Sequence, residues 1–337
     1  MNFDMHSHFI PQEFVDAIAK PGSVWQAKLV KKEGQPWILH DQGYGYPLAP
    51  GFHDTAARLA DMARTKLDMA AVSASPTIFY YYADAKLALE VAKMTNNGIF
   101  GLTREYPDKF VGMGTLPMQD VDLAIKELRR CVQDLGFRSI QIGSNVQGVQ
   151  FDDPSYLRFF KECEALEVFV FFHPYYVGTK EMFTKYYLTN LYGNPLDTAM
   201  CVASLIFGGV LENCPKLKVG FTHGGGFFPY QLGRLKHGYE VRNEPKVNGV
   251  KSPEKYVHQL YFDTIVFLDK QLRFLIDMAG ADHVMLGTDY AFDMAEFAPV
   301  DFVRGAGLTA SQLKTVLTEN ACRIFGVKEP KAAPAGR

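Results

Sequence analysis

The sequence predicts an α/β protein that folds as a closed (β/α)8 barrel of the TIM type, and two observations carry this prediction. Short apolar runs rich in β-branched or aromatic residues alternate with longer stretches of helical character, as in repeated βα units around a parallel sheet. The runs that qualify as strands are eight in number, which is the number that closes such a barrel. They cover residues 2–9, 70–75, 110–116, 139–144, 168–173, 218–223, 261–266 and 284–289.

The segments between these strands are expected to form the surrounding helices, with one exception near the N-terminus. In 122–136 apolar side chains recur near helical spacing until Gly136 ends the run. Residues 20–55 instead contain several glycines and prolines and an alternating fragment around Trp37, so we expect an inserted lobe over the barrel mouth. We expect one domain over 1–327, followed by a mobile tail over 328–337, which is rich in proline and alanine.

Composition narrows the class of protein. The chain has 337 residues, of which 47% are hydrophobic and 21% charged, enough to bury a sizeable core. With 35 basic and 37 acidic residues, the formal charge of −2 provides no basic excess to neutralise phosphates. Nucleic acid is therefore not an expected partner.

Cysteine usage and hydropathy predict a cytoplasmic location. The five cysteines are widely separated and form no C-x-x-C pair, which is typical of free thiols in a reducing compartment. The N-terminus lacks a basic start followed by an apolar stretch, and no apolar run reaches about 18 residues. We therefore expect neither a secretion signal nor a membrane span.

Residues that bind metals gather where the predicted strands end. The first strand ends in His6-Ser7-His8, whose two imidazoles should share a face because strand side chains alternate. The fifth strand ends at His173, the sixth at His223 and the eighth at Asp289. In barrels of this kind the active site lies at the C-terminal strand ends, so this coincidence predicts a site there. A single histidine of this kind would more often be a core residue bound to a backbone carbonyl.

The ligand types favour one divalent metal at this end of the barrel. Imidazole and carboxylate together suit zinc, with manganese, cobalt or iron as substitutes. The tip of the fourth strand, Gln141 to Asn145, has no lysine. A carbamylated lysine bridging two metals is therefore not expected.

His223 has two possible roles from its position. It could be a further imidazole ligand, or a base beside a metal-bound water, and we favour the base. The three glycines that follow, Gly224 to Gly226, could leave room for a substrate near the backbone or could serve only as a strand-to-helix turn. The five remaining histidines, His40, His53, His237, His258 and His283, are expected at the surface.

At this point the residues resemble the amidohydrolase superfamily, in its branch of 2-amino-3-carboxymuconate-6-semialdehyde decarboxylase and related aromatic-acid decarboxylases. The resemblance runs from residue 4 to about 327 and includes DMHSHFIP, FVGMGTLPMQD, GFRSIQIGSN, FFHPYY, FGGVLENCPKLKVGFTHGGGFFPYQLGRLKHG and VMLGTDYAFDM, in that order. Such colinearity is far more specific than an isolated H-x-H.

The resemblance implies roles for individual residues. It places the family's zinc ligands on His6, His8, His173 and Asp289, and its catalytic histidine on His223. Arg234 in the LGR segment resembles an arginine that a neighbouring subunit inserts to hold a substrate carboxylate, which implies a homodimer. The alternative for Arg234 is a solvated helix arginine.

The chain departs from the family's pattern where it would touch substrate. Tyr46 in YGYPLAP stands where a carboxylate-binding arginine is expected, and Tyr175 replaces a tryptophan after His173. Asn190 stands where the family has a later pocket tryptophan. The segment after the metal aspartate reads Tyr290-Ala291-Phe292. Tyr46, Tyr175 and Phe292 are our candidates for substrate contact, although Tyr175 and Phe292 could equally be packing residues.

These features predict a metal-dependent non-oxidative decarboxylase of a phenolic, heteroaromatic or related unsaturated carboxylic acid, with His223 and Asp289 handling protons. The nearest alternative is a hydrolase of an amide, lactone or ester, because zinc-activated water would need the same ligands. A barrel that binds ligands without catalysis is a third reading.

Overall fold

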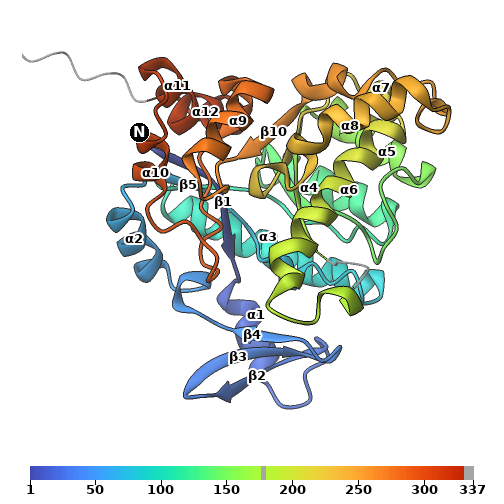
Figure 1. Ribbon diagram of the computed structural model, residues 1–337. Helices are drawn as coiled ribbons and strands as arrows, with labels where there is room; N and C mark the ends of the chain where they lie inside the picture. The colour runs from blue at the N-terminus through green and yellow to red at the C-terminus, as the bar shows by residue number, and fades with distance from the viewer. Residues whose placement is uncertain (176–179, 330–337) are drawn as a thin grey trace, which may run out of the picture.

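The computed structural model describes residues 1–175 and 180–329. Eight parallel strands form the centre of the molecule (Figure 1), at the eight positions that the sequence predicts. They are β1 (Phe3–Phe9), β5 (Met69–Ala74), β6 (Phe110–Gly112), β7 (Ser139–Gly143), β8 (Phe169–His173), β9 (Val219–Phe221), β10 (Leu260–Asp263) and β11 (Val284–Met285).

Backbone hydrogen bonds join these strands into a closed ring. Ladders connect β1 to β5 and β6, and β7 through β8, β9 and β10 to β11. The pairing of Gly114 with Ile140 joins the end of the first ladder at β6 to β7. The pairing of Ser7 with Tyr290 joins β1 to the segment that follows β11. The prediction of a (β/α)8 barrel is therefore confirmed.

Helices surround the barrel as βα units require (Figure 1). The predicted helix at 122–136 is α4, which begins after the Asp120 cap and ends at Gln133. The helices are α1 (Gln12–Ala19), α2 (Thr55–Arg64), α3 (Ala85–Glu105), α4 (Val121–Gln133), α5 (Leu157–Ala165), α6 (Asn194–Phe207), α7 (Val210–Asn213), α8 (Phe228–Val241), α9 (Asp269–Ala279), α10 (Pro299–Gly305), α11 (Ala310–Lys314) and α12 (Asn320–Phe325). In the described part of the chain, none of them is long and apolar enough to cross a bilayer.

The lower barrel is filled by apolar side chains that support the site. Phe3 and Met5 of β1 cluster with Phe169 and Phe171 of β8, and α12 adds Phe325 to the same cluster. Further along β1 the register with β5 shifts between Asp4 and Ser7. Because of this irregularity, Phe3 and Met5 point into the apolar cluster, while His6 and His8, further along the same strand, point to the C-terminal end of the barrel.

Residues 20–55 contain a separate small sheet between α1 and α2. Strands β2 (Ala27–Lys32), β3 (Gln35–His40) and β4 (Gly45–Pro47) pair antiparallel, and Figure 1 shows them beyond the end of β1, outside the barrel. Ile38 is fully buried against the main core. The expected tail lies mostly outside the described residues, which end at 329.

Candidate metal centre and active site

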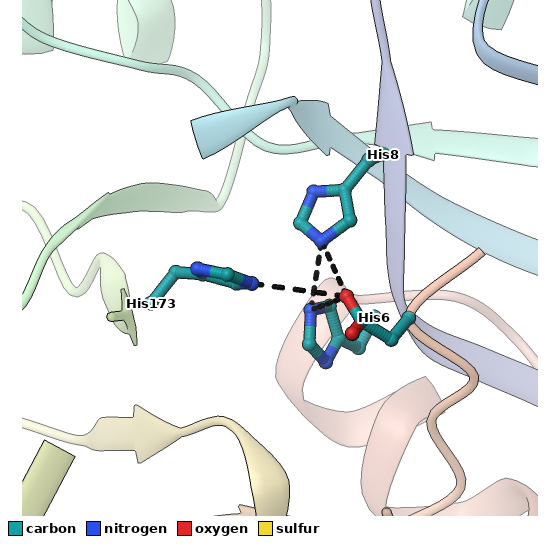
Figure 2. A group of neighbouring side chains, drawn as sticks. His6, His8 and His173 are labelled. Atoms are coloured by element: carbon teal, nitrogen blue, oxygen red, sulfur yellow. Dashed lines mark hydrogen bonds and ion pairs between the residues drawn. The ribbon is translucent and has the colours of Figure 1, made fainter. Parts of the chain in front are cut away.

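The structure brings His6, His8, His173 and Asp289 together at the C-terminal strand ends. One ligand atom from each lies within 4.8 Å of those of the others, and all four residues are buried. Nε2 of His6 is 3.0 Å from Nε2 of His8, and Oδ1 of Asp289 is 2.9 Å from Nε2 of His8. Figure 2 shows the imidazoles of His6, His8 and His173 converging on one point.

In each of the three imidazoles, Nδ1 points away from the group and contacts an oxygen atom. Nδ1 of His6 is 2.8 Å from Oδ2 of Asp263, Nδ1 of His8 is 3.2 Å from the Ala74 carbonyl, and Nδ1 of His173 is 2.8 Å from the Pro174 carbonyl. Carbonyl and carboxylate oxygens accept hydrogen bonds, so these contacts assign the ring protons to Nδ1. The three Nε2 atoms are then unprotonated and face inward.

This arrangement fits a metal ion. Unprotonated Nε2 atoms and a carboxylate oxygen are all acceptors, and acceptors 3 Å apart need a cation between them. Nε2 of His173 is a buried atom without a hydrogen-bond partner and lies 3.7 Å from Oδ1 of Asp289. Burial lowers the pKa of His8 to about 4 and that of His173 to about 3. Both therefore stay neutral, as metal ligands must.

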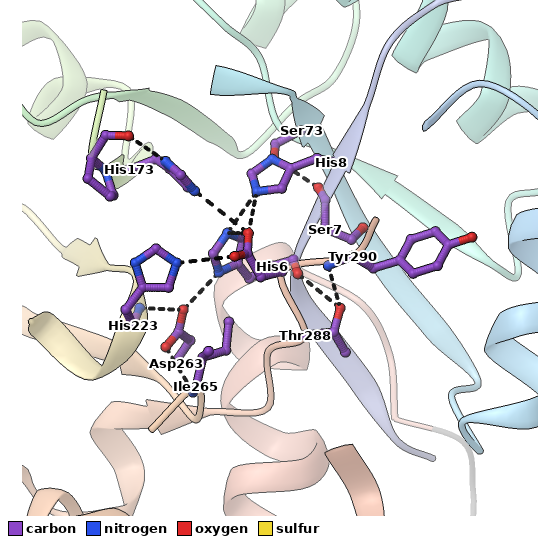
Figure 3. A network of polar contacts seen from close by, with 12 residues as sticks. His6, Ser7, His8, Ser73, His173, His223, Asp263, Ile265, Thr288 and Tyr290 are labelled. Atoms are coloured by element: carbon purple, nitrogen blue, oxygen red, sulfur yellow. Dashed lines mark hydrogen bonds and ion pairs between the residues drawn. The ribbon is translucent and has the colours of Figure 1, made fainter. Parts of the chain in front are cut away.

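His223 lies beside this group on the opposite oxygen of the aspartate. Its Nε2 is 3.3 Å from Oδ2 of Asp289 (Figure 3). Burial alone would lower the pKa of His223, but its hydrogen bond to Asp289 and the charges of Asp289 and Asp263 raise it. Burial likewise opposes ionisation of Asp289, yet the surrounding histidines hold the pKa of Asp289 well below its ordinary value. The pair is therefore a carboxylate beside an imidazole whose protonated form that carboxylate favours.

Asp263 is a site residue that the sequence reasoning missed. Besides His6, its carboxylate accepts hydrogen bonds from the backbone N–H groups of His223 at 2.9 Å, Gly224 at 2.8 Å and Ile265 at 3.1 Å. One side chain thus orients a metal-binding imidazole and the turn that carries His223 (Figure 3). A carboxylate within the predicted strand 261–266 was the available signal.

The backbone at both catalytic candidates adopts an uncommon conformation. His223 has φ 54° and Asp289 has φ 62°, in the left-handed region that non-glycine residues seldom occupy. The following glycines have a packing role: a Cβ on Gly226 would lie 2.2 Å from the Pro195 carbonyl oxygen, and Gly224 also has positive φ. Gly224 and Gly226 do line the cavity, so the turn serves both the backbone and the cavity wall.

A cavity of 1440 Å³ opens over these residues. His173, His223 and Asp289 lie at its wall, as do the predicted substrate residues Tyr175 and Phe292. Phe292 packs on His8 at a ring distance of 5.1 Å. The lobe contributes Gln42 to Tyr44, so it does border the barrel mouth.

Two expectations about the lobe need correction. Tyr46 does not line the cavity: it belongs to β4 and packs on His40 at 5.8 Å. Tyr44 precedes β4 and lines the cavity, with its hydroxyl donating to the Thr77 carbonyl at 3.0 Å. His40 is 1% exposed, because its ring stacks on Tyr44 at 4.3 Å. The expectation that it lies at the surface was wrong.

Arg234 is exposed on α8 and does not line the cavity of this chain. Tyr230 and Gln231 of the same helix do line it. The helix therefore borders the cavity. The role expected for Arg234, binding a substrate carboxylate, is a role in the site of a neighbouring subunit and not in the cavity of its own chain.

Comparison with known proteins agrees with this geometry. The chain matches the amidohydrolase family over residues 3–327. It is 34% identical to the 2-amino-3-carboxymuconate-6-semialdehyde decarboxylase of Dictyostelium discoideum over 98% of this chain and 93% of that protein. It is 27% identical to a gamma-resorcylate decarboxylase of Rhizobium, over 95% and 97% respectively.

Solved structures share the fold. The 5-carboxyvanillate decarboxylase of Sphingomonas paucimobilis aligns with a TM-score of 0.82 at 23% identity, over 97% of this chain and 99% of that one. A dihydroxybenzoic acid decarboxylase of Polaromonas, solved with bound manganese and 2-nitroresorcinol, aligns with a TM-score of 0.80 at 21% identity, covering 98% of both chains.

Proposed function

The chain belongs to the amidohydrolase family, in its branch of 2-amino-3-carboxymuconate-6-semialdehyde decarboxylase-like enzymes, and on that premise we propose that it is a metal-dependent non-oxidative decarboxylase. Its substrate is a phenolic, heteroaromatic or related unsaturated carboxylic acid. The observation that carries the proposal is the convergence of three Nε2 atoms and Oδ1 of Asp289 beneath the cavity. The named relatives favour decarboxylation over the alternative of hydrolysis.

Zinc is the metal that we propose for the site. Three imidazoles and one carboxylate suit zinc, and the structural relative from Polaromonas makes manganese its rival. A divalent metal bound there would supply positive charge to substrate oxygen atoms as negative charge develops.

The reaction needs one proton delivered to the carbon that loses its carboxylate. The bond between that carbon and the carboxylate breaks, its electron pair stays on the carbon, and carbon dioxide leaves. One acid anion and one proton thus give carbon dioxide and a product with a new C–H bond. His223 lies 3.3 Å from Oδ2 of Asp289, whose charge raises the pKa of the imidazole and favours its protonated form, and this pair faces the cavity. We assign the proton delivery to it.

Carbon dioxide release tests the proposal. Zinc-loaded protein would be incubated with hydroxybenzoates, heteroaromatic acids and muconate semialdehydes, with chelator-treated protein as the control. Metal-dependent release from one acid is expected, and His223→Asn should lower kcat by about 10²–10⁴-fold. The matched control is His237→Asn on the exposed part of α8. Efficient hydrolysis of an amide or lactone, with no carbon dioxide from any acid, would contradict the proposal.

We also infer a homodimer in which Arg234 enters the neighbouring site and binds the substrate carboxylate. Exposed apolar side chains near the cavity support an interface there, since such patches mark contact surfaces. Tyr230 on α8 is 82% exposed, and Met200 on α6, Leu191 and Tyr192 are also exposed.

Subunit mixing tests this arrangement. Arg234→Ala and His223→Asn variants are each expected to be nearly inactive, the first through a higher KM. When the two are coexpressed, a mixed dimer would contain one site with both native residues, so about a quarter of wild-type activity should return. No recovery from a proven mixed dimer would show that Arg234 does not act between subunits.

A further inference from the structure

Asp197 is a buried carboxylate that the proposed reaction does not use. It lies in the first turn of α6 and is 6% exposed. Burial raises the pKa of Asp197 to about 6, and the hydrogen bonds that its carboxylate accepts oppose this rise. Keeping an ionised group in such a place costs free energy that a neutral side chain of the same size would not. A buried carboxylate of this kind therefore indicates a role that needs both of its oxygen atoms.

Three donors point at the two oxygen atoms of Asp197. The Ser144 hydroxyl donates to Oδ2, and Nδ2 of Asn145 donates to Oδ1 at 2.8 Å. The backbone N–H of Tyr175 also donates to this carboxylate and lowers the pKa of Asp197. A carboxylate accepts all three hydrogen bonds, whereas an asparagine side chain has one acceptor oxygen and two N–H donors of its own. The ionised form of Asp197 thus matches the groups around it.

These donors follow the two strands that end beside the metal centre. Ser144 and Asn145 directly follow β7, and Tyr175 lies two residues after His173, the last residue of β8. The backbone N–H of Ser144 donates to the His173 carbonyl at 2.9 Å. Through Ser144, Asp197 therefore holds the backbone of a residue that we assign as a metal ligand.

The bond to Tyr175 acts on the imidazole of His173 by a second route. The carbonyl of Pro174 and the N–H of Tyr175 belong to one peptide group, which is planar, so the two point in opposite directions. When Asp197 holds the N–H, the carbonyl faces the other way, where its oxygen lies 2.8 Å from Nδ1 of His173. That carbonyl is the acceptor that places the ring proton of His173 on Nδ1. Asp197 thereby helps to direct Nε2 of His173 toward the other ligands.

The bond to Asn145 connects Asp197 with the cavity wall. Oδ1 of Asn145 accepts the Gly148 N–H at 2.8 Å, across the turn that carries Gln147. Because the oxygen of this buried amide is bound to Gly148, its nitrogen faces Asp197. Gln147 and Tyr175 both line the cavity. One carboxylate is therefore linked to a metal ligand and to two residues of the cavity wall.

We propose that Asp197 is a positioning residue of the metal centre. It fixes the segment from His173 to Tyr175 relative to the loop after β7, and so sets the direction of one metal ligand and the shape of the adjoining cavity wall. This inference rests on the ligand set of the proposed function and not on the reaction that takes place there. A buried carboxylate with a purely structural role would stabilise the fold without affecting the bound metal.

Cobalt-loaded full-length protein tests the proposal, because the visible absorption of bound cobalt reports the geometry of its ligands. We expect Asp197→Asn to shift the cobalt bands and to weaken zinc binding by about tenfold in competition with a chelating dye. The matched control is Glu127→Gln, which changes a carboxylate of α4 that is 2% exposed, binds Arg130 and does not line the cavity. The control should have a lower melting temperature but the spectrum and zinc affinity of wild type. A wild-type spectrum and affinity in Asp197→Asn would overturn the proposal.

Ser144 provides a second variant, which keeps the proposal testable if Asp197→Asn does not fold. Ser144→Ala removes the hydroxyl that joins Asp197 to the backbone of His173 and leaves the carboxylate in place. We expect its cobalt bands to shift away from those of wild type, with a smaller loss of zinc affinity than in Asp197→Asn. Cobalt bands at the wild-type positions in Ser144→Ala would count against the proposal in the same way.

The outcomes separate this inference from the proposed function. The cobalt spectrum and the zinc affinity are measured without substrate, so they do not depend on carbon dioxide release. Wild-type protein that binds neither metal would contradict the proposed metal centre, and this inference with it. Metal binding by wild type together with unaffected variants would contradict the role of Asp197 alone.

Discussion

Asp263 holds His6 across 257 residues of sequence, with Oδ2 of the carboxylate 2.8 Å from Nδ1 of the imidazole. The same oxygen accepts the backbone N–H of His223 at 2.9 Å. A single buried side chain thus connects the metal ligands with the residue that we assign to proton delivery.

Replacing Asp263 with asparagine should weaken metal binding by about 10–100-fold, because the acceptor that fixes the His6 tautomer is weakened. The measurement is competition for zinc against a chelating dye. Asp277→Asn, an exposed position on α9, is the matched control. Metal affinity equal to that of wild type would show that Asp263 does not orient His6.

Removing the metal should lower the melting temperature, because four acceptors then converge without a cation between them. At a metal concentration of about 1,000 times Kd, binding would stabilise the fold by about 4 kcal/mol. Thermal unfolding with and without a chelator measures this difference. The His8→Ala variant should show little of the response, and an equal response in that variant would argue against the assigned ligands.

Arg58 is a buried cation on which β1 and the turn at Gly51 depend. Its guanidinium donates to Ser7 Oγ at 3.1 Å, to the Gly51 carbonyl at 3.0 Å and to the His8 carbonyl. Arg58→Met should cost about 3–5 kcal/mol, since it leaves these acceptors and the nearby Asp4 without a charged partner. Urea unfolding measures the loss.

The control for this change lies on the same helix. Arg64 pairs with Asp61 at the surface of α2, so Arg64→Met should cost less than about 1 kcal/mol. Similar losses for the two variants would mean that the buried contacts of Arg58 contribute little.

The lobe should be sensitive to acid through His40. Burial lowers the pKa of His40 to about 4 from 6.5, so the folded protein binds this proton less readily than the unfolded chain does. The stability that neutral His40 contributes is complete above about pH 6.5 and is lost as the pH falls toward 4, by up to about 3 kcal/mol. The His40→Phe variant can keep the ring stack on Tyr44 and lacks this titration.

Fluorescence reports on this region selectively. The two tryptophans, Trp25 and Trp37, both lie within residues 20–55, so their emission follows the lobe in urea titrations. Between about pH 7.5 and about pH 5, wild type should lose more stability than His40→Phe. His237→Phe, at an exposed position, is the control and should behave like wild type. Parallel losses in all three proteins would exclude His40 as the cause.

The sequence predicted the barrel because its strands are short, apolar and separated by amphipathic helices. Their carboxyl ends were less predictable: β9 ends at Phe221 and β11 at Met285, short of His223 and Asp289. Both residues have positive φ, so the chain leaves the ladder there to aim their side chains. Periodicity carries no information about such local backbone geometry.

The convergence of His6, His8, His173 and Asp289 at one end of the barrel was predictable from the sequence, but the partners that orient these side chains were not. Asp263 meets His6 only through the closure of the ring, and Tyr44 replaces Tyr46 at the cavity because of how β4 pairs with β3. Those contacts depend on tertiary packing between distant segments, which a pattern in one stretch of sequence does not contain.

The order of the ligands along the chain has a consequence for biosynthesis. Asp289 follows His8 by 281 residues, and β1 meets the segment that carries Asp289 through the pairing of Ser7 with Tyr290 and through the hydrogen bond from the Met5 N–H to the Leu286 carbonyl at 2.8 Å. The imidazoles of His6 and His8 are therefore synthesised long before Asp289. The complete set of ligands that we propose therefore forms only after Asp289 has been synthesised, and we expect the metal to reach its full coordination late in the synthesis of the barrel.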